Sequence, residues 1–152
     1  DVVNVTSAAD MADVVKSKAA EQDIIIMTAA VADFCPSHPA DEKIKKNDSS
    51  YESVIELERT EDILSYLGAH KAKGQLICGF SMETQNMLEN SKAKLAKKNA
   101  DMIVANNLKV AGAGFGTDTN VVTLITADDC TELEIMDKSC VASRIMDRLL
   151  QM

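Results

Sequence analysis

The sequence contains few aromatic residues and no tryptophan. Its two tyrosines and three phenylalanines cannot fill the core of a 152-residue chain. The core must therefore consist mainly of Val, Ile, Leu, Met and Ala, as is usual in parallel sheets that helices cover. An excess of basic residues is also absent, because the formal net charge is −8. This charge argues against a general nucleic-acid surface, which requires a basic stripe.

Signals for membranes, secretion, zinc and disulfides are missing too. No apolar run approaches the roughly 20 residues of a membrane span, and the acidic start at Asp1 lacks a basic signal region. The four cysteines form no CxxC pair, and the histidines do not cluster, so neither a zinc site nor a disulfide framework is indicated. Cys78 lies in an apolar stretch and is expected to be core packing. A cytoplasmic protein without membrane or nucleic-acid partners is predicted.

About 150 residues is the length of one domain, so residues 1–152 are predicted to be a single domain. Hydrophobic periodicity and cap residues alternate strands with helices, which is typical of a parallel sheet. The prediction is an α/β, Rossmann-like, mostly parallel sheet flanked by helices, with a C-terminal β-hairpin and a closing helix. The predicted strands are 1–6, 23–28, 51–57, 75–80, 102–105, 121–126 and 131–136, and the predicted helices are 7–21 (capped by Ser7), 60–70 (capped by Thr60), 86–99 and 138–150.

A candidate nucleotide site begins with the small residues AAVADF at 29–34, directly after the apolar run Ile24–Met27. A buried parallel strand would end there, and open α/β sheets bind ligands at that edge. Ten residues after Asp33, the run KIKK at 43–46 supplies three ammonium groups suited to phosphates. Either motif alone has a simpler explanation, close packing or a solvated lysine face. The two motifs in this order favour a nucleotide site.

Further along the chain, Ser91, Lys94 and Lys98 fall at helical spacing, so both lysines project from one stripe and could reach one polyphosphate. By itself this pattern is more typical of an exposed lysine face. Residues 60–64 begin a helix after a strand, where free backbone N–H groups favour an anion; an ordinary capped surface helix explains them equally well. The glycines at 112–116 are no dinucleotide fingerprint, because a strand and not a helix follows them.

Five motifs in register carry a resemblance: AAVADF at 29–34, KIKK at 43–46, GFSMET at 79–84, KKNADMIVAN at 97–106 and GFGTDTN at 114–120. Over nearly its whole length the chain resembles phosphopantothenoylcysteine synthetase, the ligase half of the bacterial bifunctional coenzyme A biosynthesis flavoprotein. The resemblance implies a CTP-dependent ligase that joins 4′-phosphopantothenate to cysteine through an acyl-cytidylate. CTP and Mg²⁺ are the implied co-substrate and ion, and FMN belongs only to the decarboxylase domain, which is absent here.

The resemblance also implies roles for single residues. Lys43 is expected to be catalytic and to contact CTP, and no metal-ligating residue is predicted. Glu61 stands where the family usually has proline. The implied nucleotide-binding residues are Ala29, Ala30, Asp33, Lys43, Glu61, Asp62, Ile63, Leu64, Phe80, Lys94 and Lys98.

The implied partners are the three small molecules, a second copy in a homodimer that completes the site, and a fused decarboxylase domain. The family has an upstream strand, a glycine-rich turn and an Asn-x-Ser-Ser-Gly segment, so this chain is expected to be an N-terminally truncated portion. Two alternatives remain open. One is a non-catalytic nucleotide-binding or interaction module, and the less favoured one is a nicotinamide-dependent oxidoreductase, for which no GxGxxG motif opens a helix.

Overall fold

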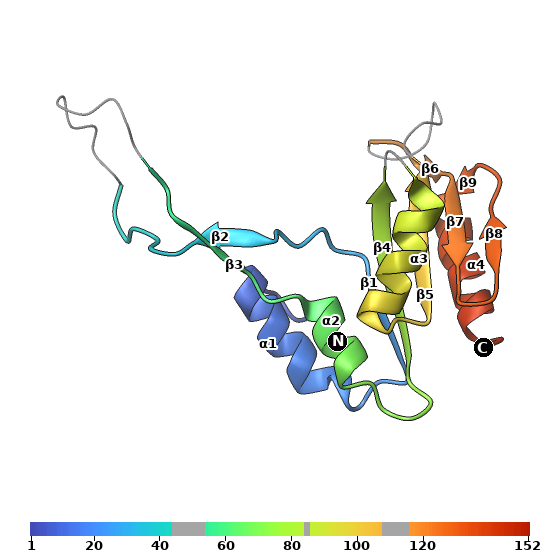
Figure 1. The fold of residues 1–152 in the computed structure, drawn as a ribbon, viewed down its shortest axis with the longest axis horizontal. Coiled ribbons are helices and arrows are strands. Elements are labelled where there is room, and N and C mark those ends of the chain that lie inside the picture. Colours follow the sequence, from blue (N-terminus) through green and yellow to red (C-terminus); the bar gives the residue numbers. More distant parts are fainter. Residues whose placement is uncertain (44–53, 84–85, 108–115) are drawn as a thin grey trace.

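A computed structural model describes residues 1–43, 54–83, 86–107 and 116–152. Its centre is a five-stranded sheet in the order β1-β4-β5-β7-β8 (Figure 1). Strands β1 (Ile24–Met27), β4 (Leu76–Glu83) and β5 (Met102–Asn107) run parallel. Strand β7 (Val122–Ile125) is antiparallel to β5, and β8 (Cys130–Glu132) is antiparallel to β7. This mixed sheet with a C-terminal hairpin confirms the predicted Rossmann-like architecture.

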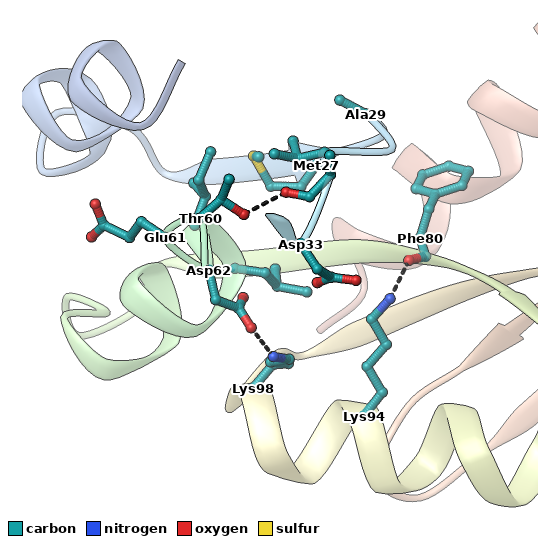
Figure 2. A pocket seen from close by; sticks show the side chains of 13 residues that line it. Met27, Ala29, Asp33, Thr60, Glu61, Asp62, Phe80, Lys94 and Lys98 are labelled. Atoms are coloured by element: carbon teal, nitrogen blue, oxygen red, sulfur yellow. Dashed lines mark hydrogen bonds and ion pairs between the residues drawn. The ribbon is translucent and has the colours of Figure 1, made fainter. Parts of the chain in front are cut away.

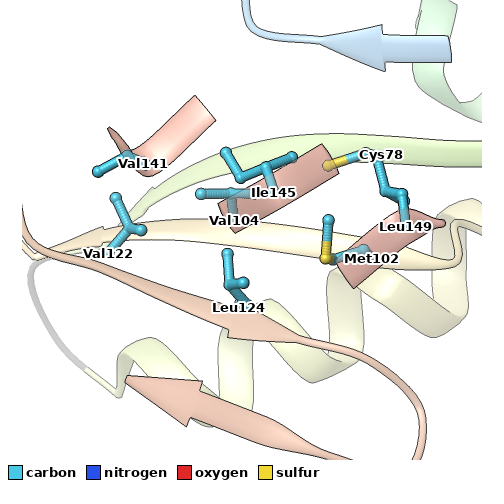
Figure 3. Packing of buried hydrophobic residues seen from close by; sticks show 8 residues of the cluster. All are labelled: Cys78, Met102, Val104, Val122, Leu124, Val141, Ile145 and Leu149. Carbon is cyan, nitrogen blue, oxygen red and sulfur yellow. The ribbon is translucent and has the colours of Figure 1, made fainter. Parts of the chain in front are cut away.

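Helix α4 (Lys138–Leu149) covers one face of the sheet and closes the first hydrophobic core. The predicted residues Val141, Ile145 and Leu149 do face the sheet, where they are buried, as Figure 3 shows. Their partners alternate along the strands, since only every second strand residue points to this face. These partners are Cys78, Met102, Val104, Val122 and Leu124. Burial raises the pKa of the Cys78 thiol to about 12, in keeping with the packing role predicted for it.

Helices α1 (Ala8–Ala19), α2 (Ile63–Ala69) and α3 (Met87–Lys98) lie on the opposite side (Figure 1). A second core gathers there from α1, α2 and β4, and its buried members are Ala12, Ile63, Leu67 and Ile77. Burying each large aliphatic side chain contributes roughly 1.5–3 kcal/mol. Ser7 caps α1 as predicted, because its Oγ accepts from the Asp10 amide at 3.1 Å. Among the described residues, no helix has both the length and the apolar character that crossing a membrane requires.

Several strand predictions are wrong. Residues 1–6 form no strand and are exposed, although Asp1 and Val3 line a cavity together with Ile25 of the edge strand β1. The predicted ends of β4 at residue 80 and of β5 at residue 105 are too early, because these strands run to Glu83 and Asn107. Asn106 and Asn107 stay in the ladder opposite Met82 and Glu83, so pairing with β4 outweighs the turn preference of two asparagines.

The last predicted strand, 131–136, is divided in the structure. Its first part belongs to β8, and Met136–Asp137 forms the separate strand β9, which pairs with β6 (Thr119–Asn120). The local pattern could not reveal this break, since it depends on which neighbour each half pairs with.

Strands β2 (Phe34–Pro36) and β3 (Leu57–Arg59) form a two-stranded antiparallel arm that extends away from the main sheet (Figure 1). The strand predicted at 51–57 overlaps β3 only at Leu57, and residues 51–53 lie outside the described residues. Strand β2 was not predicted. Both strands are three residues long, so their pairing with each other, and not a hydrophobic alternation, defines them.

Candidate functional site

A cavity of about 180 Å³ lies beside the carboxyl end of β1, between the turn that leads into α2 and the side of α3 (Figure 2). Nearly all of the predicted nucleotide-binding residues line it; Ala30 and Lys43 do not. Met27 lines it without having been predicted as a site residue; Thr60 lines it as part of the 60–64 turn proposed for an anion, although it was not among the implied nucleotide-binding residues. The full lining is Met27, Ala29, Val31, Ala32, Asp33, Thr60, Glu61, Asp62, Ile63, Leu64, Phe80, Lys94 and Lys98.

Thr60 joins the two chain segments at the base of the arm. Its hydroxyl donates a hydrogen bond to the Ala32 carbonyl, and its backbone amide donates to the Asp33 carbonyl at 3.0 Å. Thr60 was predicted to cap α2, but it does not. Asp62 is the cap, because its Oδ1 accepts from the Ser65 amide at 2.9 Å and the helix begins at Ile63. The sequence placed Thr60 beside Glu61 in the predicted anion turn. It could not reveal the partner of the Thr60 hydroxyl, which is 28 residues away in the chain.

The Lys98 ammonium group is held at the N-terminus of α2. Its ammonium group pairs with the Asp62 carboxylate and donates to Ser65 Oγ at 3.0 Å (Figure 2). Only 13% of the Lys98 side chain is exposed, so this lysine is not part of a solvated face. Partial burial alone would raise the pKa of Asp62, but the hydrogen bonds from Lys98 and from the Ser65 amide outweigh it and lower that pKa.

Lys94 lies one turn earlier on α3 and donates to the Phe80 carbonyl of β4 at 2.8 Å (Figure 2). One further turn back, the buried Ser91 hydroxyl meets the Ser81 hydroxyl at 2.8 Å. The predicted stripe of Ser91, Lys94 and Lys98 therefore does face β4 and the cavity. Ser91 fastens the helix to the sheet, and the two lysines bring cationic groups to the cavity.

The opposite wall carries the groups predicted for a nucleoside. Figure 2 shows the Asp33 carboxylate in the space between Asp62 and Phe80, with the Phe80 ring on the side of Ala29. An ionised carboxylate only accepts hydrogen bonds, which suits hydroxyl or amine groups of a ligand. The arrangement therefore places one acceptor and one aromatic ring opposite two ammonium groups.

Lys43 lies outside this cavity. It is exposed, and the segment that ends at residue 43 runs out along the arm, away from the sheet (Figure 1). Ile44, Lys45 and Lys46 lie outside the described residues, as do residues 84, 114 and 115 of the other motifs. The catalytic role of Lys43 stays a prediction.

The described part of the chain holds no cluster of three or more His, Cys, Asp or Glu side chains that could bind a metal. A magnesium ion commonly takes only one or two protein carboxylates together with substrate phosphates and water. Asp33, which lines the cavity and has no ion pair with a lysine among the described residues, fits such a limited contribution. Asp62 fits it less well, because Lys98 already occupies one of its oxygens.

The ion pair between Asp62 and Lys98 leads to a prediction about stability and pH. We expect Asp62→Asn, which preserves the helix cap, to lower the free energy of unfolding by about 0.5–1 kcal/mol near pH 7, since the carboxylate is half exposed. The folded-state pKa is lowered, so this stabilisation is present above the ordinary value of 3.8 and is lost as the pH falls through the lower value. Urea unfolding of both proteins across this range measures it. A difference that does not change with pH would contradict this explanation.

The mixed sheet, with a cavity lined by two lysines and three acidic residues beside the carboxyl end of a parallel strand, defines a Rossmann-like α/β protein whose candidate ligand site is in the usual position for that class. Within this class the particular family is clear. The model of the DNA/pantothenate metabolism flavoprotein C-terminal domain matches residues 1–152, and the chain belongs to this family.

Two curated relatives are similar over almost the whole chain. The coenzyme A biosynthesis bifunctional protein CoaBC of Bacillus subtilis (strain 168) is 47% identical over 150 residues, which are 98% of this chain and 36% of that protein. A cysteine/cysteine sulfinic acid decarboxylase from an unknown prokaryotic organism is 44% identical over 151 residues, 99% of this chain and 42% of that protein. The chain thus spans less than half the length of either relative.

Solved structures share the fold. The crystal structure of the C-terminal domain of a coenzyme A biosynthesis bifunctional protein CoaBC matches with a TM-score of 0.76 and 41% identity, over 98% of this chain and 66% of that one. A mutant of Cab2 in complex with phosphopantothenate-cysteine matches with a TM-score of 0.69 over 98% of this chain and 52% of that one. Its identity is 18%, so the likeness concerns the fold alone.

Proposed function

We propose that this chain is the CTP-binding part of a phosphopantothenate–cysteine ligase that acts in coenzyme A biosynthesis. Family membership and the name of the B. subtilis relative support the pathway. The observation that carries the proposal is the convergence of Lys94 and Lys98 on a cavity whose other wall holds Asp33 and Phe80. Such a cavity suits a ligand that is anionic at one end and aromatic at the other.

The aromatic end of CTP would lie against the AAVADF segment. Backbone groups of residues 29–32 can read the cytosine edge as a base partner would, and Asp33 can accept from the ribose or from an exocyclic amine. Phe80 can cover one face of the base. The cavity volume of about 180 Å³ is smaller than the roughly 300–1,000 Å³ of sites that enclose a whole ligand. We therefore expect these residues to form only part of the complete site.

The triphosphate would lie between α3 and the turn into α2. In the structure both lysine ammonium groups already have acceptors, the Phe80 carbonyl for Lys94 and the Asp62 carboxylate for Lys98. A phosphate can replace or share these acceptors without a large movement, because the lysine stems are already directed along the cavity. Charge-assisted hydrogen bonds of this kind are roughly twice as strong as neutral ones.

In the proposed reaction, a carboxylate oxygen of 4′-phosphopantothenate attacks the α-phosphorus of CTP, and the bond to the departing pyrophosphate breaks. The cysteine amine then attacks the acyl carbon of the acyl-cytidylate, an amide forms, and CMP leaves. The first step brings negative charges together, so fixed cations stabilise its transition state electrostatically. Mg²⁺ bound with the phosphates would supply further positive charge.

We propose that Lys43 acts from the arm of a second copy in a homodimer. The arm extends away from the sheet that carries its own cavity (Figure 1). It also exposes large apolar side chains that a monomer would leave in water, with Val54 86%, Ile55 70% and Leu57 60% exposed. Sedimentation analysis tests this arrangement. If the protein is a monomer at the concentration of an activity assay, Lys43 has no second copy whose cavity it could enter, and this arrangement is contradicted.

The test of the proposed function is the choice of nucleotide. We expect CTP with Mg²⁺ to bind more tightly than ATP and to raise the melting temperature, because a ligand at a hundred times its dissociation constant adds about 2.7 kcal/mol of stability. Calorimetry with CTP, ATP and NAD compares the candidates directly. Equal or tighter ATP binding would contradict the CTP assignment, and stabilisation by NAD alone would favour an oxidoreductase. CTP binding without ligase activity in a protein that spans the full length of the curated relatives would favour a non-catalytic module.

A further inference from the structure

Glu61 is the unusual residue of the cavity. It places a carboxylate directly before Asp62, in the turn where the triphosphate is proposed to lie, and it lines the cavity. A second negative charge facing the phosphates would oppose binding. Figure 2 shows, however, that the Glu61 side chain is directed away from Lys94 and Lys98.

Lys16 of α1 holds this carboxylate. Its Nζ lies 2.5 Å from Glu61 Oε2, and the two side chains are 27% and 44% exposed. The pairing joins residues 45 positions apart, so it depends on the packing of α1 against α2. The hydrogen bond to Glu61 raises the pKa of Lys16, so the lysine remains charged.

Tyr66 fixes the other side of Lys16. The ammonium lies 5.1 Å from the centre of the Tyr66 ring, which itself stacks on His70 at 4.1 Å between centroids. A cation over an aromatic face is attracted to it. Lys16 is thus placed by two residues that belong to α2 and to the turn before it, and it can keep Glu61 in one orientation.

We propose that Lys16 is a positioning residue for the phosphate end of the cavity, because its ion pair keeps the Glu61 carboxylate turned away from Lys94 and Lys98. The inference rests on the proposed function, since it assumes that phosphates enter this cavity. It also gives a physical reason why the chain can carry a glutamate at this position. The added negative charge has a dedicated cation on a neighbouring helix.

The test measures binding of CTP, CMP and inorganic tripolyphosphate to a small set of variants. Lys16→Met keeps the apolar stem but releases Glu61, and we expect it to weaken CTP and tripolyphosphate by roughly 3–10-fold through charge repulsion while leaving CMP less affected. Lys16→Arg should retain wild-type affinity, because it preserves the ion pair. Lys18→Met is the matched control, since it removes the same charge from an exposed position on the same helix.

The double variant Lys16→Met with Glu61→Gln decides the matter. If Lys16 acts through Glu61, removing the glutamate charge should restore the affinity for both polyphosphates, and Lys16→Met should then have almost no effect. Thermal unfolding verifies that each variant is folded. If Lys16→Met does not fold, Lys16→Gln with and without Glu61→Gln gives the same comparison, because glutamine also removes the charge that pairs with Glu61.

The outcomes separate the two proposals. Tripolyphosphate binding that depends on Lys16 in the absence of CTP binding would overturn the proposed function and support this inference. Equal affinities in wild type and Lys16→Met, or a loss that Glu61→Gln does not restore, would overturn the inference even if CTP binds. A wild-type protein that binds neither polyphosphate would overturn both.

Discussion

Replacing Lys98 with alanine is expected to weaken CTP binding by about 5–150-fold, which corresponds to the roughly 1–3 kcal/mol of a charge-assisted hydrogen bond. The side chain is 13% exposed and its ammonium lies at the cavity beside Asp62 and Ser65. Its loss leaves the Asp62 carboxylate facing the phosphates without a neighbouring cation. CMP, which lacks the outer phosphates, should lose much less affinity. Isothermal titration with both nucleotides measures the difference.

Lys97→Ala is the matched control for this experiment. Lys97 is the preceding residue of α3 and is exposed, so its removal changes the net charge equally but leaves the cavity intact. Its CTP affinity should remain within about twofold of wild type, because an exposed charge is screened by solvent and salt. Comparable losses in the two variants, or equal effects on CTP and CMP, would show that Lys98 does not contact the outer phosphates.

Gly68→Ala is expected to lower the free energy of unfolding by about 3 kcal/mol or more, at the upper end of what overpacking costs. A Cβ at this position would lie 1.8 Å from the Lys98 carbonyl oxygen and 2.8 Å from its carbonyl carbon. Backbone atoms cannot rotate aside, so α2 and α3 would have to separate. The Asn99 side chain, which donates to the Gly68 carbonyl at 2.7 Å, joins the helices at the same point.

The expected fall in melting temperature for Gly68→Ala is about 6–12 °C, with weaker CTP binding because Lys98 moves with α3. Gly79→Ala is the comparison. Its Cβ would meet the Leu64 side chain at 2.7 Å, and a side-chain end can shift where a backbone cannot. Calorimetric melting of both variants should therefore rank Gly68→Ala as clearly more damaging. A melting temperature near that of wild type for Gly68→Ala would mean that α2 and α3 pack less closely than the structure indicates.

The sequence alone predicted the central strands of the main sheet and the helices that cover it, although not every strand or strand end. Apolar runs such as Ile24–Met27, the Ser7 capping box and the spacing of Val141, Ile145 and Leu149 are local signals, and each describes how a segment meets a core. The resemblance of five ordered motifs identified the family, and the comparisons confirmed it. Most residues predicted for the nucleotide do line one cavity, although their contacts with a ligand remain predictions.

The tertiary structure decided what depends on partners far apart in the chain. The short arm strands are strands only because they pair with each other, whereas residues 1–6 pair with no strand in the structure described. The periodicity of α3 could not distinguish a solvated lysine face from one directed at β4; packing against the sheet and the Asp62 pair made that choice. Likewise, the ion pair between Glu61 and Lys16 joins residues 45 positions apart in the sequence. Local sequence determines propensity and periodicity, whereas a side chain's charged or hydrogen-bonded partner is fixed only when distant segments pack together.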